Sequence, residues 1–194
     1  MLQENEKNKM DNNLKIIKIA VIGDGTVGKT NLLNRYTLNE PITDYEPTVF
    51  DNYSTEIHLG GKSYLLQLFD TSGQEEYDRL RKLSYVERDC IIICFAVNNK
   101  NSYQHVKEKW ISDVRQSNKT AKILLVGTKS DLRDDPNEDL VDPEQGVKMM
   151  KIIKAKGYME CSSLRNDGVQ NVFSEAIRIV LCEWQKRKRK CEIL

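Results

Sequence analysis

The stretch Gly23-Asp24-Gly25-Thr26-Val27-Gly28-Lys29-Thr30 matches the phosphate-binding pattern G-x-x-x-x-G-K-[ST] at every fixed position. It follows an apolar run, 16–22, that is typical of a buried strand, and the residues after it, 31–38, favour a helix. A glycine-rich turn from strand to helix points backbone N–H groups and the positive end of the helix dipole into one concavity. The sequence therefore predicts a phosphate site at the start of that helix.

Two side chains of this loop have specific expected roles. Lys29 is expected to place its ammonium group against the β and γ phosphates, and the Thr30 hydroxyl to be one ligand of an octahedral Mg²⁺. The residues expected to contact the bound nucleotide here are Gly25, Thr26, Val27, Gly28, Lys29, Thr30 and Asn31. The alternative is a plain left-handed turn before a helix, which the flanking strand and helix patterns disfavour.

Length and composition limit the class of protein. With 194 residues, of which 39% are hydrophobic, the chain is expected to form one domain, residues 14–184, between a disordered arm, 1–13, and a basic tail, 185–194. The net charge of +1 gives no indication of nucleic-acid binding. The longest apolar run, 90–97, is far shorter than the ~18 residues of a membrane span. Five cysteines without a C-x-x-C pair indicate a reducing compartment, without disulfides or cysteine-bound metal.

Strand and helix patterns alternate along the chain. Strand-like runs occur at 16–22, 48–59, 63–69, 90–97, 123–127 and 158–161. Helical patterns occur at 31–38, from 77 to about 83, at 101–117, at 143–156 and at 169–184, where the apolar stripe is predicted to be core. This order predicts an α/β fold with a six-stranded, mostly parallel sheet, helices on both faces and one antiparallel edge strand from the hairpin at Gly60-Gly61. Ligands in such folds bind beyond the carboxyl ends of the strands.

Asp70-Thr71-Ser72-Gly73-Gln74-Glu75 follows the third strand. Asp70 can hold Mg²⁺ through water, Gly73 can offer its N–H to a γ-phosphate, and the Gln74 amide can orient an attacking water. The pattern D-x-x-G alone is as often an ordinary turn. It becomes specific because it follows a phosphate loop by about 40 residues.

The segment Tyr45-Glu46-Pro47-Thr48 lies in the loop before the second strand. Thr48 is expected to supply a second hydroxyl to Mg²⁺ and its N–H to the γ-phosphate, and Tyr45 to contact the nucleotide. The alternative is a β-branched strand start after a proline.

Two further motifs follow the last two strands. In Thr128-Lys129-Ser130-Asp131-Leu132, the Asp131 carboxylate can accept hydrogen bonds from N1–H and the exocyclic amine of guanine, a pattern that adenine lacks. The stem of Lys129 is expected to lie along the purine face, and Thr128 and Leu132 to complete the base site. In Ser162-Ser163-Leu164, after Cys161, backbone N–H groups can bind the guanine carbonyl.

Residues 14–194 resemble the Ras-superfamily small GTPases, and within them the Rho/Rac branch. The features typical of the branch are Thr48-Val49-Phe50-Asp51-Asn52-Tyr53, Tyr77-Asp78-Arg79-Leu80-Arg81 with Leu83-Ser84-Tyr85, and Thr128-Lys129. The resemblance implies the P-loop NTPase fold of small GTPases, GTP and GDP as bound nucleotides, Mg²⁺ as cofactor, and Gln74 and Lys29 as catalytic residues. It further implies two switch segments, about 41–51 and 70–83, which the γ-phosphate orders.

Partners are also implied by the resemblance. They are exchange factors, activating proteins that insert an arginine, a dissociation inhibitor, and effectors that read 41–53 and 70–83 in signalling to the actin cytoskeleton. The GTPase itself is expected to be a monomer.

The chain departs from the Rho/Rac pattern at four places. Pro41 replaces an aromatic residue that covers the guanine edge, which predicts faster release of GDP. Ser72 replaces an alanine and Thr26 a smaller residue, while Gly25 and Gln74 favour retained hydrolysis. The segment 134–143 is too short for the extra charged helix of the branch.

The lone His58 and His105 are predicted to be surface or strand residues.

The final residues Cys191-Glu192-Ile193-Leu194 match the C-a-a-X pattern, in which a terminal leucine predicts geranylgeranylation of Cys191. The basic run 186–190 supplies the second signal that a single lipid needs, at about 1 kcal/mol per basic residue near an anionic membrane. Residues 186–191 are therefore expected to bind an anionic membrane, with the protein cytoplasmic and anchored to the cytoplasmic face of the plasma membrane. The alternatives for the run are a solvated helix end and a nuclear-import patch.

Two other functions compete with a GTPase switch. A metabolic P-loop kinase or ATPase would gain nothing from Asp131, because adenine cannot satisfy that carboxylate. A GTP-loaded docking module with negligible hydrolysis would not need Gly25 and Gln74.

Overall fold

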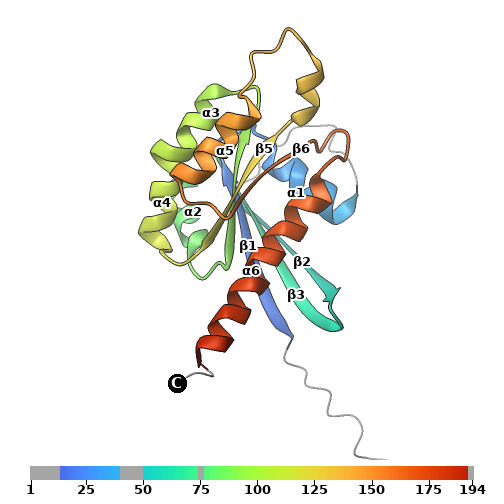
Figure 1. Cartoon of the computed structure of the whole chain (residues 1–194), viewed down its shortest axis with the longest axis vertical. Coiled ribbons are helices and arrows are strands. Elements are labelled where there is room, and N and C mark those ends of the chain that lie inside the picture. The colour runs from blue at the N-terminus through green and yellow to red at the C-terminus, as the bar shows by residue number, and fades with distance from the viewer. Residues whose placement is uncertain (1–13, 40–49, 74–76, 192–194) are drawn as a thin grey trace, which may run out of the picture.

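A computed structural model describes residues 14–39, 50–73 and 77–191 of the chain (Figure 1). Six strands form one sheet in the order β2-β3-β1-β4-β5-β6. The strands are β1 (Lys15–Gly23), β2 (Phe50–Leu59), β3 (Lys62–Thr71), β4 (Cys90–Ala96), β5 (Lys122–Thr128) and β6 (Gly157–Cys161). Only the edge pair β2 and β3 is antiparallel; the other neighbours are parallel. The predicted fold class is confirmed.

Helical segments connect the strands. They are α1 (Lys29–Leu38), α2 (Asp78–Tyr85), α3 (Lys100–His105), the π-helix η2 (Val106–Trp110), α4 (Ile111–Ser117), the 3₁₀-helix η3 (Ser130–Asp134), α5 (Pro143–Ile152) and α6 (Val169–Cys191). Because parallel strands need crossover connections, these helices cover both faces of the sheet.

Each face of the sheet has its own hydrophobic core. One core joins α1 and α6 to alternate strand residues such as Ile92 and Leu124, and Figure 1 shows α6 running along the sheet past β1. The other core joins α2, η2, α4 and α5 to the intervening residues, such as Ile93 and Leu125. All residues of β4 are buried, as expected for a central parallel strand. The predicted apolar stripe of α6 lies in the first core, with Trp184 at its margin.

The structure corrects the limits of three predicted helices. The helix expected over 143–156 ends at Ile152, because Lys154 adopts a left-handed conformation (φ 56°) and the Lys156 N–H already donates to Ile123 O of β5. The helix expected over 101–117 is interrupted by η2. The last helix does not end near Trp184 but continues to Cys191.

Several predictions fall on residues whose structure is not described. They concern the arm 1–13, Pro41, Tyr45, Thr48, Gln74 and residues 192–194. Residues 135–142 are described and contain no helix, as the shortened segment predicts. Among the described helices, none combines the length and apolar character that a membrane span requires.

Thr26 is a β-branched residue in the left-handed region, with φ 61°. This conformation costs an L-residue about 1–2 kcal/mol, of which the greater unfolded-state entropy of glycine would return about 0.4–1. We expect Thr26→Gly to raise the free energy of unfolding by about 0.5–1 kcal/mol in urea titrations. As a control, Thr55→Gly at an exposed position of β2 should lower it. Equal losses in both variants would contradict strain at Thr26.

Candidate functional site

The phosphate loop lies at the carboxyl end of β1 and leads directly into α1. Gly23 adopts φ 144°, and a Cβ on it would lie 2.3 Å from Cys94 O of the neighbouring strand, so only glycine fits. Gly28, with φ 91° and ψ 26°, is the N-cap of α1, which begins at Lys29. The loop thus directs the N-terminal N–H groups of a ten-residue helix to the edge of the sheet where ligands of this fold bind.

Lys29 is buried at the base of this loop, with 6% of its surface exposed. Its Nζ donates to the Asp24 backbone oxygen over 2.8 Å. Burial lowers the pKa of Lys29, and the nearby Asp70 carboxylate opposes that shift. Among the described residues, this ammonium group has one carbonyl and a nearby carboxylate as partners, which leaves it suited to an additional anion such as a phosphate.

Thr30 and Asp70 form a hydrogen-bonded pair of oxygen groups near Lys29. The Thr30 hydroxyl donates to Asp70 Oδ2 over 2.6 Å, and Asp70 Oδ1 is buried without a hydrogen-bond partner among the described residues. Burial raises the pKa of Asp70, although the Thr30 hydroxyl and Lys29 act in the opposite direction. A hydroxyl beside a buried carboxylate with a spare oxygen fits a hard cation such as Mg²⁺. Within 14–39, 50–73 and 77–191 there is no cluster of three or more His, Cys, Asp or Glu that could hold a metal.

Gly73 packs directly on the phosphate loop. A Cβ on Gly73 would lie 2.3 Å from the carbonyl carbon of Asp24 and 2.3 Å from the Gly25 nitrogen. The preceding Ser72 is buried, and its backbone oxygen accepts a hydrogen bond from Arg81 Nη1 of α2 over 2.7 Å. Gly73 is therefore held against the loop by close backbone packing, and Ser72 is held by α2.

We expect Gly73→Ala to destabilise the protein, because the added methyl group would overlap the Asp24–Gly25 peptide. Overpacking of this kind costs about 1–3 kcal/mol, measurable as a lower free energy of unfolding in urea after removal of the nucleotide. Gly25→Ala is the matched control, since a Cβ there has no described atom within 4 Å, and should change stability by less than about 0.5 kcal/mol. Equal stability of both variants would show that the contact at Gly73 is not tight.

The predicted base-binding segments meet at the same edge of the sheet. The Thr128 hydroxyl lies 2.5 Å from Val27 O and 3.0 Å from Phe95 O, so it ties the end of β5 to the phosphate loop and to β4. Lys129, in a left-handed conformation with φ 60°, then starts η3, which carries Asp131 and Leu132. Asp131 Oδ1 accepts a hydrogen bond from Ser162 Oγ over 2.5 Å. This bond holds one carboxylate oxygen in place and joins the two segments predicted to recognise the base.

The backbone of Ser163 and Leu164 is held by Arg35, a residue that the sequence analysis did not identify. Arg35 lies on α1 with 8% of its surface exposed, and its guanidinium donates to Ser163 O over 2.8 Å and to Leu164 O over 3.3 Å. A lone arginine within a helical pattern gives no signal of this long-range contact.

A second group that the sequence analysis missed surrounds Asp24. His105 Nδ1 lies 2.7 Å from Asp24 Oδ2, and Trp110 Nε1 donates to Asp24 Oδ1 over 2.7 Å. His105 is half exposed, as predicted, but lies on α3 against the phosphate loop. His105 and Trp110 lie 81 and 86 positions after Asp24 in the chain, and no sequence pattern connects residues so far apart.

The structure brings most of the predicted site residues together. Direct contacts join Thr30 to Asp70, Gly73 to the phosphate loop, Val27 to Thr128, and Asp131 to Ser162. Asn31 is exposed in the first turn of α1. The structure does not place Tyr45, Thr48 or Gln74, and it describes only the backbone of Cys191, at the end of α6.

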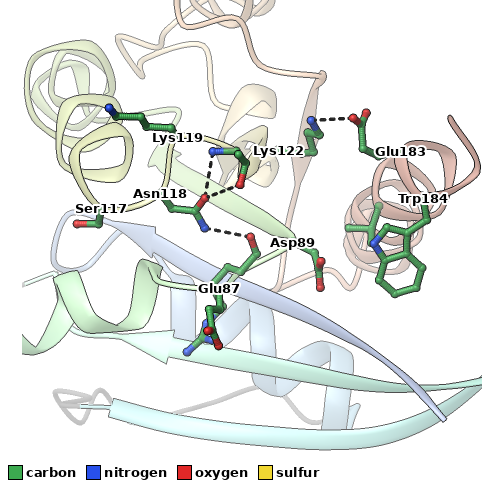
Figure 2. A pocket seen from close by; sticks show the side chains of 11 residues that line it. Glu87, Asp89, Ser117, Asn118, Lys119, Lys122, Glu183 and Trp184 are labelled. Carbon is green, nitrogen blue, oxygen red and sulfur yellow. Dashed lines mark hydrogen bonds and ion pairs between the residues drawn. The ribbon is translucent and has the colours of Figure 1, made fainter. Parts of the chain in front are cut away.

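A separate polar pocket of about 490 Å³ lies before the first residues of β4 and β5 (Figure 2). Its walls include Asn118, whose amide donates to Tyr85 O and Arg88 O, and the ion pair of Lys122 and Glu183 at 3.2 Å. It contains none of the predicted site residues and lies at the amino ends of the strands. The phosphate loop and the base-binding segments are therefore at the opposite end of the sheet.

The model of one protein family matches most of the chain. It is described as the Ras family and covers residues 18–182, from β1 to α6. The match includes the phosphate loop, the Thr30–Asp70 pair and Asp131. Proteins of this type bind guanine nucleotides and Mg²⁺ and hydrolyse GTP. With this match, the fold and the site geometry, the chain belongs to the Ras family of small GTPases.

Proposed function

We propose that this chain is a switch of the Rho/Rac type that cycles between GDP-bound and GTP-bound states and hydrolyses GTP slowly. The observation that supports a guanine-nucleotide site is the pair of contacts from Ser162 to Asp131 and from Thr128 to Val27, which joins the segment of the carboxylate proposed to select guanine to the phosphate loop. The proposed site differs from an ATP-binding site in the Asp131 carboxylate, which would pair with the two donors on the guanine edge.

Separate groups of residues are proposed to bind the phosphates, hold Mg²⁺ and orient the attacking water. The N–H groups at the start of α1 and the Lys29 ammonium bind the β and γ phosphates, and stabilise the charge that develops when the terminal bond breaks. Thr30 and Asp70 would hold Mg²⁺ directly and through water. A Mg²⁺ ion held there would neutralise phosphate charge. Gln74 is proposed to orient the attacking water.

Gly73 supports a switching role for the segment after β3. Because the backbone of Gly73 lies against Asp24 and Gly25, a small movement of the phosphate loop would displace Gly73. Its N–H is proposed to bind the γ-phosphate, so that residues 70–83 and 41–51 adopt one arrangement with GTP and another after hydrolysis. Effectors that read 41–53 and 70–83, exchange factors, activating proteins and a dissociation inhibitor are the proposed partners of the monomer, in signalling to the actin cytoskeleton.

Single-turnover release of phosphate from the GTP-loaded protein tests this proposal. Wild type should release phosphate on the order of 10⁻⁴ to 10⁻³ per second, and an activating protein of the Rho branch should accelerate the release by up to ~10⁵. The Gln74→Leu variant should bind GTP but release little phosphate, with or without the activating protein. A wild-type protein that binds GTP and releases no phosphate, even with the activating protein, would instead be a docking module.

We also propose that the protein is cytoplasmic and anchored at the plasma membrane. The proposal rests on the C-a-a-X sequence with a terminal leucine and on the basic run 186–190 at the end of α6. The geranylgeranylated chain should float with vesicles that contain anionic lipid and much less with neutral vesicles. The Cys191→Ser variant should bind neither kind of vesicle. Equal flotation of the geranylgeranylated chain with neutral and anionic vesicles would contradict a role for the basic run.

A further inference from the structure

We propose that His105 and Trp110 are positioning residues that clamp Asp24 and thereby fix the phosphate loop for nucleotide retention. The inference rests on the guanine-nucleotide site described above and assigns a role to two residues outside its motifs. Both Asp24 carboxylate oxygens are engaged, one with each ring, at 2.7 Å. The side chain of Asp24 is 20% exposed, so these contacts are partly shielded from water.

The local helix geometry explains how two residues five positions apart reach one carboxylate. In an α-helix, residues i and i+5 point about 140° apart, since each residue turns the chain by about 100°. Between His105 and Trp110 the chain instead forms the π-helix η2, in which the Ile111 N–H donates to Val106 O, five residues earlier. Residues five apart then lie one turn apart on the same face. This single wide turn brings both rings to Asp24.

Asp24 is well placed to transmit this clamp to the nucleotide site. Its backbone oxygen accepts the 2.8 Å hydrogen bond from Lys29 Nζ. The Asp24–Gly25 peptide is also the surface on which Gly73 packs. A shift of Asp24 would therefore move a phosphate-binding ammonium group and the backbone that contacts the second switch segment.

Trp110 extends the same contact to α2. Its ring is fully buried, and the Arg81 guanidinium carbon lies 4.7 Å from the ring centre. Arg81 in turn donates to the backbone oxygen of Ser72, next to Gly73. The phosphate loop and the start of the second switch segment thus share one support, the indole of Trp110, which contacts Asp24 through its N–H and Arg81 through its face.

The charged groups around the clamp are consistent with a role in positioning. Of the described charged side chains, Asp24 faces His105, while Arg81 and Lys109 lie near the Trp110 ring, Lys109 at 5.3 Å from its centre. Among the described residues, neither His105 nor Trp110 has a hydrogen bond or ion pair with a predicted phosphate, metal or base ligand. They act on the loop through Asp24.

The chain contains two histidines and two tryptophans, which provides matched controls. His105→Leu removes one clamp contact from a half-exposed position, and Trp110→Phe removes only the indole N–H and part of the ring. His58→Leu removes a 2.8 Å hydrogen bond to Ser63 at the far end of β2, and Trp184→Phe changes the ring on α6. His105→Gln keeps a donor and serves as the rescue variant.

Two measurements distinguish the effect of the clamp on the phosphate loop from the effect of the bound nucleotide. The first is amide hydrogen exchange of the 23–30 peptide, measured with GDP and after its removal with EDTA. The second is the rate of release of a fluorescent GDP. Because a hydrogen bond to a charged group is worth about a tenfold change, His105→Leu and Trp110→Phe should each raise both rates at least about fivefold. His105→Gln, His58→Leu and Trp184→Phe should stay within about twofold of wild type.

A double-mutant cycle with Asp24→Ala completes the test. If the clamp acts through Asp24, adding His105→Leu to Asp24→Ala should raise the release rate by less than about twofold. Full additivity, or exchange and release rates within twofold of wild type for both His105→Leu and Trp110→Phe, would overturn the inference. Should Trp110→Phe fail to fold, His105→Leu decides. A wild-type protein that retains no GDP would contradict the proposed function, while exchange of the nucleotide-free 23–30 peptide still tests the clamp.

Discussion

Replacing Asp131 by asparagine should lower the affinity for GDP by about 100- to 1,000-fold, because two charge-assisted hydrogen bonds to the guanine edge are lost. The remaining contact should survive, since the asparagine oxygen can still accept the hydrogen bond from Ser162 Oγ. The loss would therefore report on the base and not on a collapsed site. Displacement of a fluorescent GDP by unlabelled nucleotide measures it.

The same variant should gain affinity for xanthosine diphosphate. Xanthine presents a carbonyl where guanine has its exocyclic amine, and the asparagine amide can donate to it while the carboxylate cannot. Asp134→Asn is the control, because Asp134 lies on the same 3₁₀-helix with 71% of its side chain exposed and pairs with Arg165. If Asp131→Asn bound GDP as wild type does, or if Asp134→Asn lost as much, Asp131 would not select the base.

Replacing Lys29 by methionine should reduce the affinity for GDP by about 100- to 1,000-fold, with a larger loss for GTP. Methionine fills the buried space of the lysine stem but provides no charge to the β and γ phosphates. The loss is large because Lys29 is 6% exposed and water cannot replace its ammonium group. Equilibrium titration with both fluorescent nucleotides measures the two affinities.

The control for this variant is Lys18→Met on β1, a lysine of the same strand–loop–helix unit whose amine is 3.8 Å from the exposed Glu87. It should bind both nucleotides as wild type does. A Lys29→Met protein that retained nearly full affinity would place the phosphates elsewhere, and the buried ammonium would then be a structural group.

The parts of the fold that the sequence predicted are those with local signals. The phosphate loop has a sequence motif, β4 is a continuous apolar run, and α6 has an apolar stripe with the helical period. The structure places β4 and the stripe of α6 in the core, as these signals predict. Helix ends were less predictable. The helix beginning at Pro143 stops at Ile152 because the chain must join β6, and pairing with β5 is a long-range constraint with no local signal.

The site divides in the same way. Asp70, Thr128 and Asp131 follow predicted strands, so the rule for parallel sheets places them at one edge. Arg35 and the clamp on Asp24 could not be predicted, because each contact joins residues at least 81 positions apart through side chains of ordinary appearance. The π-helix that makes the clamp possible depends on one shifted hydrogen bond, and residues 105–111 contain no proline or glycine to indicate it.

Competition between GDP and ADP for the wild-type protein tests the central claim most directly, because it asks whether the site selects guanine. Protein loaded with fluorescent GDP in the presence of Mg²⁺ should lose about half of its label to equimolar unlabelled GDP at equilibrium. ADP should need an excess of at least about 1,000-fold, since adenine leaves the Asp131 carboxylate unpaired. Displacement by ADP and GDP at similar concentrations would contradict the assignment of a guanine-nucleotide switch.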